Sequence, residues 1–378
     1  MTRKGTLIWL LVTVLITVTA GYGGAWYASR FYDGFQTQAQ LSGEMTDDGA
    51  DDGAVSFTES DGSYVYSQNV LSANRMPLTI PEIVSAVADS VVEIATETVM
   101  TGRFSQRTMP GAGSGVILSI DGYIVTNNHV IENADNIYVR LRNGTAYEAR
   151  LIGRDIKSDL AVIKIEAIGL KPAHIGNSDG LVVGELAVAI GNPLGSLGGT
   201  VTEGIISALN RDIYLEGEYM SLLQTSAAVS PGNSGGGLFN QYGELIAIIN
   251  TKSSGSDIEG IGFAIPGNTV DSVVSQLIQY GYVLGRVDFG IDMIDILDTF
   301  TAMRYRLSGT GVYVGRDDDD SGLRSSDRII RVAGEEVRSS SEVKAVYEQY
   351  KVGDILQVVI ERGGKQYTVN VTLKQAKA

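Results

Sequence analysis

The chain has 378 residues and a hydrophobic content of 44%, which suits two globular domains that fold in water. Its formal net charge of −15 argues against a nucleic-acid partner, because phosphates require a basic protein surface. The absence of cysteine excludes disulfides, thiolate catalysis and zinc–thiolate sites, and any mechanism that needs an imidazole must use His129 or His174.

An uncharged apolar run from Leu7 to Ala28 follows Arg3 and Lys4 near the N-terminus. A helix of about 20 residues spans the roughly 30 Å hydrocarbon core of a bilayer. Basic residues before such a run predict that the N-terminus stays inside and the rest of the chain outside. We therefore predict a cytoplasmic tail at 1–6 and a single transmembrane anchor at 7–28. The alternative is a cleaved signal peptide, because Val-Thr-Ala at 18–20 resembles a cleavage site; the apolar run continues beyond it, which favours the anchor.

Residues 29–77 are predicted to form an acidic, disordered linker. They repeat Asp-Asp-Gly-Ala in tandem at 47–50 and 51–54 and bury too little apolar surface to order themselves. Like charges extend such a spacer. The alternating ligand spacing of a calcium loop is missing, so a calcium site is not favoured.

The region 78–281 has many short β-rich runs separated by turn signals, which is typical of antiparallel barrels or sandwiches. Asp121-Gly122 and Asn143-Gly144 are placed as hairpin turns. The predicted strands are Val91–Val99, Gly115–Ser119, Tyr123–Thr126, Asn136–Leu141, Ala146–Ile152, Leu160–Ile165, Glu185–Ile190, Val201–Ala208 and Glu244–Asn250.

Two helices are predicted in the same region. Pro81–Ala88 would form a short helix with proline in its first turn. A longer amphipathic helix is indicated by apolar residues at helical spacing between Val270 and Ile278, with Asn268 as its N-cap and Gly281 at its end.

The segment 285–375 is predicted to be a smaller α+β domain. It contains a strand-like run at Gly311–Gly315, a helix around Val343–Tyr350 and a final hairpin at Gly363-Gly364. Its acidic run, Asp317–Asp320, is most simply a solvated loop.

Gly232-Asn233-Ser234-Gly235-Gly236 has the composition of a nucleophile loop. A serine hydroxyl needs a neighbouring base and backbone amides aimed at the developing oxyanion, and flanking glycines let the backbone bend tightly. We expect Gly232, Asn233 and Ser234 to form the oxyanion hole. Taken alone, the pentapeptide is equally consistent with an ordinary loop.

His129 and Asp159 are the candidate base and its orienting carboxylate. His129 follows a predicted strand and Asp159 precedes one, and each alone is as easily structural. Together with Ser234 they stand in the order His, Asp, Ser, which is that of chymotrypsin-like barrels.

With these motifs the chain resembles the HtrA family, the DegP-like and DegS-like proteases. The resemblance implies a chymotrypsin-like double antiparallel β-barrel at 78–281, a PDZ domain at 285–375, and a catalytic triad of His129, Asp159 and Ser234 without a cofactor or metal. The stretches that carry it are GSGVILSIDGYIVTNNHVI, SDLAVIKI, AIGNPLG, TVTEGIISALNR, LQTSAAVSPGNSGG and GIGFAIPGNTV. Ser226, Ser230 and Gly237 depart from the usual pattern and put loop detail in doubt.

The resemblance also suggests where substrate specificity lies. The position six residues before the serine forms the base of the primary pocket, and here it is Ala228, which predicts preference for an aliphatic residue before the scissile bond. Ile261 and Phe263 are candidate walls of that pocket, or plain core residues.

In the C-terminal domain Phe289-Gly290-Ile291 is similar to the loop by which PDZ domains hold a peptide carboxylate. The acidic run at 317–320 would favour basic peptide tails or have no role. Gly111-Ala112-Gly113-Ser114-Gly115 is not a nucleotide fingerprint, because a strand follows it rather than a helix.

The predicted function is hydrolysis of misfolded or signalling proteins outside the cytoplasm, regulated by peptide C-termini at the PDZ domain. Two alternatives remain: a regulated-off protease that acts mainly as a peptide-binding chaperone, and a dedicated signalling protease for one membrane partner. The resemblance also implies a possible homotrimer.

Overall fold

The structure, a computed structural model, describes most of the chain beyond the N-terminal region. The described residues are 76–101, 106–192, 199–215, 218–230, 232–251, 261–316, 318 and 321–377. The predicted anchor at 7–28 and nearly all of the predicted linker at 29–77 lie outside them. None of the helices within these ranges is long and apolar enough to cross a membrane.

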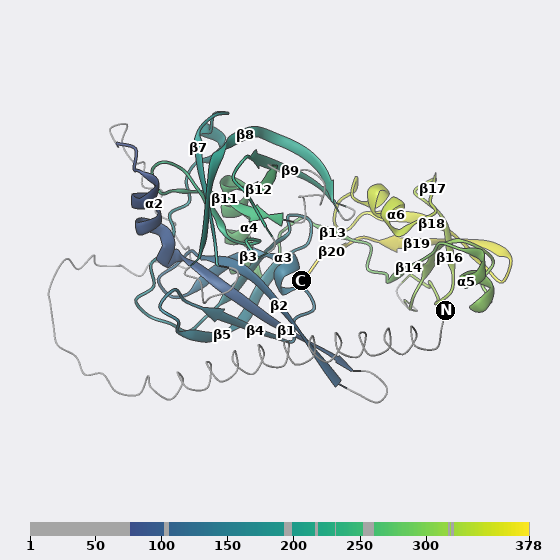
Figure 1. Cartoon of the computed structure of the whole chain (residues 1–378). Helices are drawn as coiled ribbons and strands as arrows, with labels where there is room; N and C mark the ends of the chain where they lie inside the picture. The colour runs from purple at the N-terminus through teal and green to yellow at the C-terminus, as the bar shows by residue number, and fades with distance from the viewer. Residues whose placement is uncertain are drawn as a thin grey trace, which may run out of the picture. The chain divides into compact units, whose positions relative to one another are not determined.

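The first half of the 78–281 region forms a closed six-stranded barrel in the order β1-β2-β3-β6-β5-β4 (Figure 1). Gly122 makes the turn from β2 to β3 with φ +100, and a Cβ there would stand 2.3 Å from the Ile165 carbonyl oxygen, so this predicted hairpin requires glycine. The strands are β1 (Val91–Thr101), β2 (Gln106–Ile117), β3 (Tyr123–Asn127), β4 (Asn136–Arg140), β5 (Ala146–Asp155) and β6 (Leu160–Lys164).

The second half forms another closed six-stranded barrel, in the order β10-β11-β12-β9-β8-β7. The expected antiparallel barrels are therefore confirmed, although β9, β10 and β12 were not predicted. The strands are β7 (Leu186–Gly191), β8 (Thr200–Leu215), β9 (Glu218–Thr225), β10 (Gly237–Phe239), β11 (Leu245–Asn250) and β12 (Gly262–Pro266).

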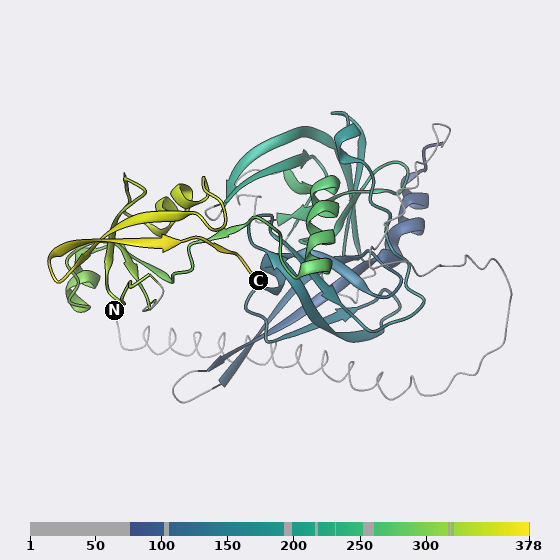
Figure 2. The same ribbon diagram turned by 180° about the vertical axis from the view of Figure 1, so that it is seen from behind.

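Short helical segments flank the barrels: α2 (Ile80–Val87), η1 (Ala88–Ser90), α3 (Asn128–Ile131) and η2 (Ser178–Gly180). The long predicted helix is α4 (Gly267–Tyr280), which packs against β6 of the first barrel and β11 of the second (Figure 2). Gly281 ends it with φ +81, as predicted. The prediction that Asn268 is its N-cap was wrong, because the helix begins at Gly267 and the Asn268 Oδ1 instead accepts from the Ser178 amide at 3.2 Å.

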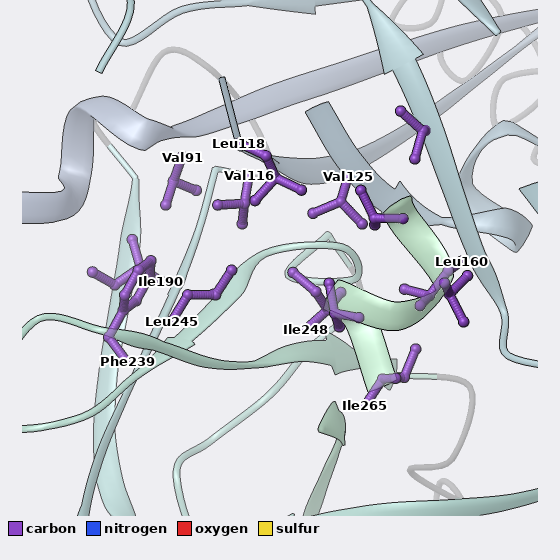
Figure 3. Close-up of a cluster of buried hydrophobic side chains, with 14 of the residues drawn as sticks. Val91, Val116, Leu118, Val125, Leu160, Ile190, Phe239, Leu245, Ile248 and Ile265 are labelled. Atoms are coloured by element: carbon purple, nitrogen blue, oxygen red, sulfur yellow. The ribbon is translucent and has the colours of Figure 1, made fainter. Parts of the chain in front are cut away.

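A shared core between the two barrels fixes their relation to each other (Figure 3). Strand β6 shows how one segment serves two cores: Leu160 and Val162 belong to the cluster between the barrels, whereas Ala161 and Ile163 belong to the interior of the first barrel. Successive side chains of a strand point to opposite faces, so a strand buried on both faces is a continuous apolar run. Other members of the shared core are Val91, Val116, Leu118, Val125, Ile190, Phe239, Leu245, Ile248 and Ile265.

The C-terminal domain has a six-stranded antiparallel sheet with the main order β14-β15-β16-β18-β19, and β17 pairs with β16. Strand β14 is therefore at one edge of the sheet. The predicted strand, helix and final hairpin are confirmed. Its elements are β13 (Val287–Asp288), β14 (Met293–Ile296), α5 (Thr299–Arg304), β15 (Gly311–Val314), β16 (Arg328–Val332), β17 (Glu335–Glu336), α6 (Ser340–Tyr347), β18 (Ile355–Arg362), β19 (Lys365–Thr372) and β20 (Lys374–Gln375).

Replacing Phe239 by alanine should destabilise the barrels by about 3–5 kcal/mol, because Phe239 is fully buried between them. Urea unfolding followed by far-ultraviolet circular dichroism measures this. Phe239→Leu, which keeps most of the volume, should cost less than about 1.5 kcal/mol. Ile168→Ala is the control, because Ile168 is 97% exposed; a loss for this variant as large as for Phe239→Ala would contradict the account.

Candidate active site

His129 and Asp159 meet at one end of the first barrel. His129 lies in α3, the single turn after β3, and Asp159 lies in the turn before β6 with the unusual backbone angle φ +52. The His129 Nδ1 is 2.7 Å from the Asp159 Oδ2, and the His129 amide donates to Oδ1 at 3.0 Å. Because an ionised carboxylate only accepts hydrogen bonds, Nδ1 carries the proton and Nε2 is left as the acceptor.

Asn250 of the second barrel is a third partner of this carboxylate. It is the last residue of β11, and its Nδ2 donates to the Asp159 Oδ2 at 3.1 Å. The residue was not predicted as a site residue. The available signal was a polar amide at the end of a strand whose other residues are all apolar.

The loop that carries Ser234 is held by the first barrel through Ser114 of β2. The Ser114 amide donates to the Ser234 carbonyl at 2.8 Å, and the Ser114 hydroxyl donates to the Gly232 carbonyl at 2.7 Å. Gly235 has φ +81, and a Cβ there would stand 2.2 Å from the Ser114 carbonyl oxygen. The glycine-rich stretch at 111–115 thus belongs to a strand that supports the nucleophile loop, consistent with the rejection of a nucleotide site.

The amides of the three expected oxyanion donors differ in their hydrogen bonding. The amides of Gly232 and Ser234 donate to no acceptor on the described part of the chain. The amide of Asn233, by contrast, donates to the Ser230 carbonyl at 3.0 Å, so its inclusion in the oxyanion hole was wrong.

The Ser234 hydroxyl is bonded to the Thr251 hydroxyl. Within the described ranges, no hydrogen bond joins Ser234 Oγ to the His129 ring. Thr251 directly follows Asn250, so two successive residues at the end of β11 contact Asp159 and Ser234 respectively. The Ser- and Gly-rich segment Thr251–Glu259 is a candidate switch from its sequence, but its residues 252–259 lie outside the described residues.

The three candidate pocket residues lie around the junction of β9 and β12. A Cβ placed on Gly262 would stand 3.0 Å from Val229 Cγ2 and 3.2 Å from the Ala227 carbonyl oxygen. The segment that contains Ala228 therefore runs against the residue between Ile261 and Phe263. Phe263 is partly buried and packs against the core shared by the barrels, so at least part of its side chain is a core residue as the alternative interpretation expected.

The candidate carboxylate loop of the C-terminal domain precedes the edge strand β14. Phe289 is buried and stacks on Tyr347 of α6 with 5.5 Å between ring centroids, so it anchors the loop through its side chain. Gly290 has φ +72, and its amide donates to the Asp288 Oδ1 at 2.8 Å. A peptide carboxylate that uses this amide would have to displace the Asp288 carboxylate.

Lys374 brings a cation to the same loop and was not predicted. Its Nζ is 3.8 Å from the position that a Cβ of Gly290 would occupy. Lys374 reaches the loop because β20 pairs with β13 in the register Asp288↔Lys374. This long-range pairing left no signal in the sequence.

Comparison with known proteins gives the same two parts. Residues 113–248 match the trypsin-like peptidase domain, and residues 288–373 match the PDZ domain. The chain is 43% identical over 282 residues to the serine protease Do-like HtrB of Bacillus subtilis, covering 69% of this chain and 61% of that protein. It is 39% identical over 285 residues to the periplasmic serine endoprotease DegP of Escherichia coli, covering 73% and 59%. The chain thus spans about three fifths of the length of these relatives.

A solved structure of the HtrA-type protease AlgW with a decapeptide is 32% identical in sequence, with a TM-score of 0.51. The match covers 80% of this chain and 100% of that structure's chain. The serine endoprotease from Yersinia pestis is 34% identical, with coverage of 80% and 100% and a TM-score of 0.50. The fold and site define a trypsin-like peptidase unit joined to one PDZ domain. The chain belongs to the HtrA family of serine proteases.

Replacing Ser234 by alanine should lower peptidase activity about 10⁴-fold or more while leaving the fold intact, because only the hydroxyl is removed. Casein cleavage by the purified variant measures the loss, and circular dichroism checks the fold. A matched control is Ser226→Ala, which removes another serine hydroxyl of the same barrel, one that accepts from the Ile205 amide. Near-normal turnover by the Ser234 variant would contradict the assignment.

Proposed function

We propose that the protein is a serine endopeptidase in which Ser234 is the nucleophile, His129 the general base and Asp159 the carboxylate that orients His129. The observation that carries the proposal is the Asp159 carboxylate, which accepts from the His129 ring, the His129 amide and Asn250. These bonds present Nε2 as the acceptor that a serine nucleophile needs.

The reaction follows from this arrangement. The Ser234 Oγ attacks the scissile carbonyl carbon and His129 Nε2 takes its proton, while the amides of Gly232 and Ser234 bind the oxyanion. His129 then gives the proton to the leaving amine as the carbon–nitrogen bond breaks. Water then attacks the acyl-enzyme while His129 Nε2 takes its proton, and His129 returns that proton to the Ser234 Oγ as the acyl group leaves. The residue expected at the base of the primary pocket is Ala228 and not an acidic one, which favours an aliphatic side chain before the scissile bond.

The bond between Ser234 and Thr251 favours regulation of this activity. Attack requires the Ser234 hydroxyl to donate to His129, so a bond in which it donates to Thr251 instead would support a resting state of the nucleophile. The same observation supports the second candidate function, a protease that is held off and mainly binds peptides.

We further propose that peptide C-termini bound at the PDZ domain raise protease activity. Arg286 directly precedes β13 and the carboxylate loop, and its guanidinium makes two hydrogen bonds, of 3.1 and 2.8 Å, to the buried Asp155 carboxylate. The Asp155 carboxylate also accepts from the amide and the hydroxyl of Ser158, and Ser158 is directly followed by Asp159. A change at the loop can therefore reach the turn that presents Asp159.

A saturating C-terminal peptide should raise the cleavage rate of a small chromogenic substrate that cannot reach the PDZ domain. Tenfold activation corresponds to about 1.4 kcal/mol of coupling. Arg286→Gln should keep peptide binding but reduce the activation below about twofold, whereas Arg331→Gln, a surface control on the same domain, should not. An unchanged rate across the titration would mean that the domain only tethers substrates.

The protein is also proposed to act outside the cytoplasm while anchored by residues 7–28, possible substrates being misfolded proteins or one membrane partner. The uncharged run behind Arg3 and Lys4 supports this. Membrane fractionation with N-terminal sequencing should find the mature chain in membranes with this run intact. A soluble chain that starts at Gly21 would show that the run is a signal peptide instead.

A further inference from the structure

Strand β14 and helix α6 are neighbours in the C-terminal domain, and we infer that a bound peptide would lie in a groove along their junction. β14 pairs with β15 on one side and is the edge of the sheet. An edge strand presents backbone groups to which an extended peptide can add as a further strand. Ile291 and Met293 pack against the core cluster to which Val343 and Tyr347 of α6 also belong.

Asp295 continues this face of the strand, because alternate residues of a strand share a face. Its two carboxylate oxygens accept from the Ser340 amide and the Ser340 hydroxyl, both at 2.7 Å, at the first residue of α6. Ile296 points the other way, into a separate cluster with Ala302 and Tyr313. The residues Ile291, Met293 and Asp295 thus give this face two apolar side chains followed by an acidic one.

The two ends of the groove carry opposite charges. The loop at Gly290 has the Lys374 ammonium beside it, and the far end has the Asp295 carboxylate. At about 3.3 Å per residue, Ile291 and Asp295 are roughly 13 Å apart along the strand. An antiparallel peptide with its carboxylate at Gly290 places its last residue opposite Ile291. The residue four positions earlier then lies opposite Asp295, on the same face.

We propose that Asp295, held by Ser340, is a specificity determinant that selects a lysine or arginine four residues before the C-terminus of a bound peptide. This rests on the proposed binding of peptide C-termini to this domain. The carboxylate retains acceptor capacity beyond its two bonds to Ser340, since its oxygens offer about four lone-pair sites. It is half-buried, and a cation there would be screened less than on the open surface. The acidic run at 317–320 lies, except for Asp318, outside the described residues, and its role stays a prediction.

The competing explanation is that Asp295 only fastens the start of α6. Asp295→Asn separates the two roles, because an asparagine has nearly the same shape and can still bond Ser340, yet it has no charge. Asp298→Asn is the matched control: Asp298 is exposed, lies three residues along and accepts from Thr301 in α5.

The experiment measures binding of labelled decapeptides to the full chain carrying Ser234→Ala, which prevents cleavage. The peptides end in an apolar residue and differ only at the fifth position from the C-terminus, with lysine or the isosteric, uncharged norleucine. We expect the lysine peptide to bind about threefold to fivefold more tightly, the range of a partly exposed ion pair. The ratio of the two affinities should approach one in about 1 M salt, because salt screens the ion pair.

In the Asp295→Asn variant the preference should vanish while the affinity for the norleucine peptide stays unchanged; Asp298→Asn should keep the preference. Equal binding of both peptides to the parent chain, or a preference that survives Asp295→Asn, would overturn the inference. Equal weakening of both peptides in Asp295→Asn would assign Asp295 a structural role and overturn it too. If neither peptide binds the parent chain, the proposed peptide-binding function itself fails.

Discussion

The site depends most on the three hydrogen bonds that Asp159 accepts. One comes from the His129 ring, one from the His129 amide and one from Asn250 of the other barrel. A carboxylate in this position fixes the ring's orientation and its tautomer together. The backbone of Asp159 takes φ +52, a strained angle for a residue with a side chain. The Asn128 amide and the Asn127 side chain donate to its carbonyl at 3.0 Å each and hold that angle.

The shared core makes these contacts possible, because His129 and Asp159 come from one barrel and Ser234 and Asn250 from the other. Leu160 directly follows Asp159, and Ile248 lies two residues before Asn250; both are fully buried in the core between the barrels. Ser114 reinforces the junction, because its amide donates to the Ser234 carbonyl and its hydroxyl donates to the Gly232 carbonyl. Because protein interiors are close-packed and deform little, the polar groups at the edge of this core keep fixed distances from one another.

The local patterns predicted the barrels, α4 and the candidate residues His129, Asp159 and Ser234, because alternation, turn glycines and a glycine-framed serine are local signals. The contributions of Asn250, Thr251 and Lys374 were not predictable, since each depends on a pairing between distant segments. The Asn233 amide was misassigned because sequence shows which residues form a turn but not where each amide points. Likewise Asp295 is an ordinary strand residue until its bonds to Ser340 place it in a groove.

The most direct test of the account is the tautomer of His129, because the chain has only two histidines and their imidazole signals are easily separated. Nitrogen-15 NMR of histidine-labelled protein, with His174→Gln to assign the spectrum, reports which ring nitrogen carries the proton. The account predicts that neutral His129 is protonated at Nδ1 and that Asp159→Asn abolishes this state. A His129 ring protonated at Nε2, or one that exchanges between both tautomers as a free imidazole does, would contradict it.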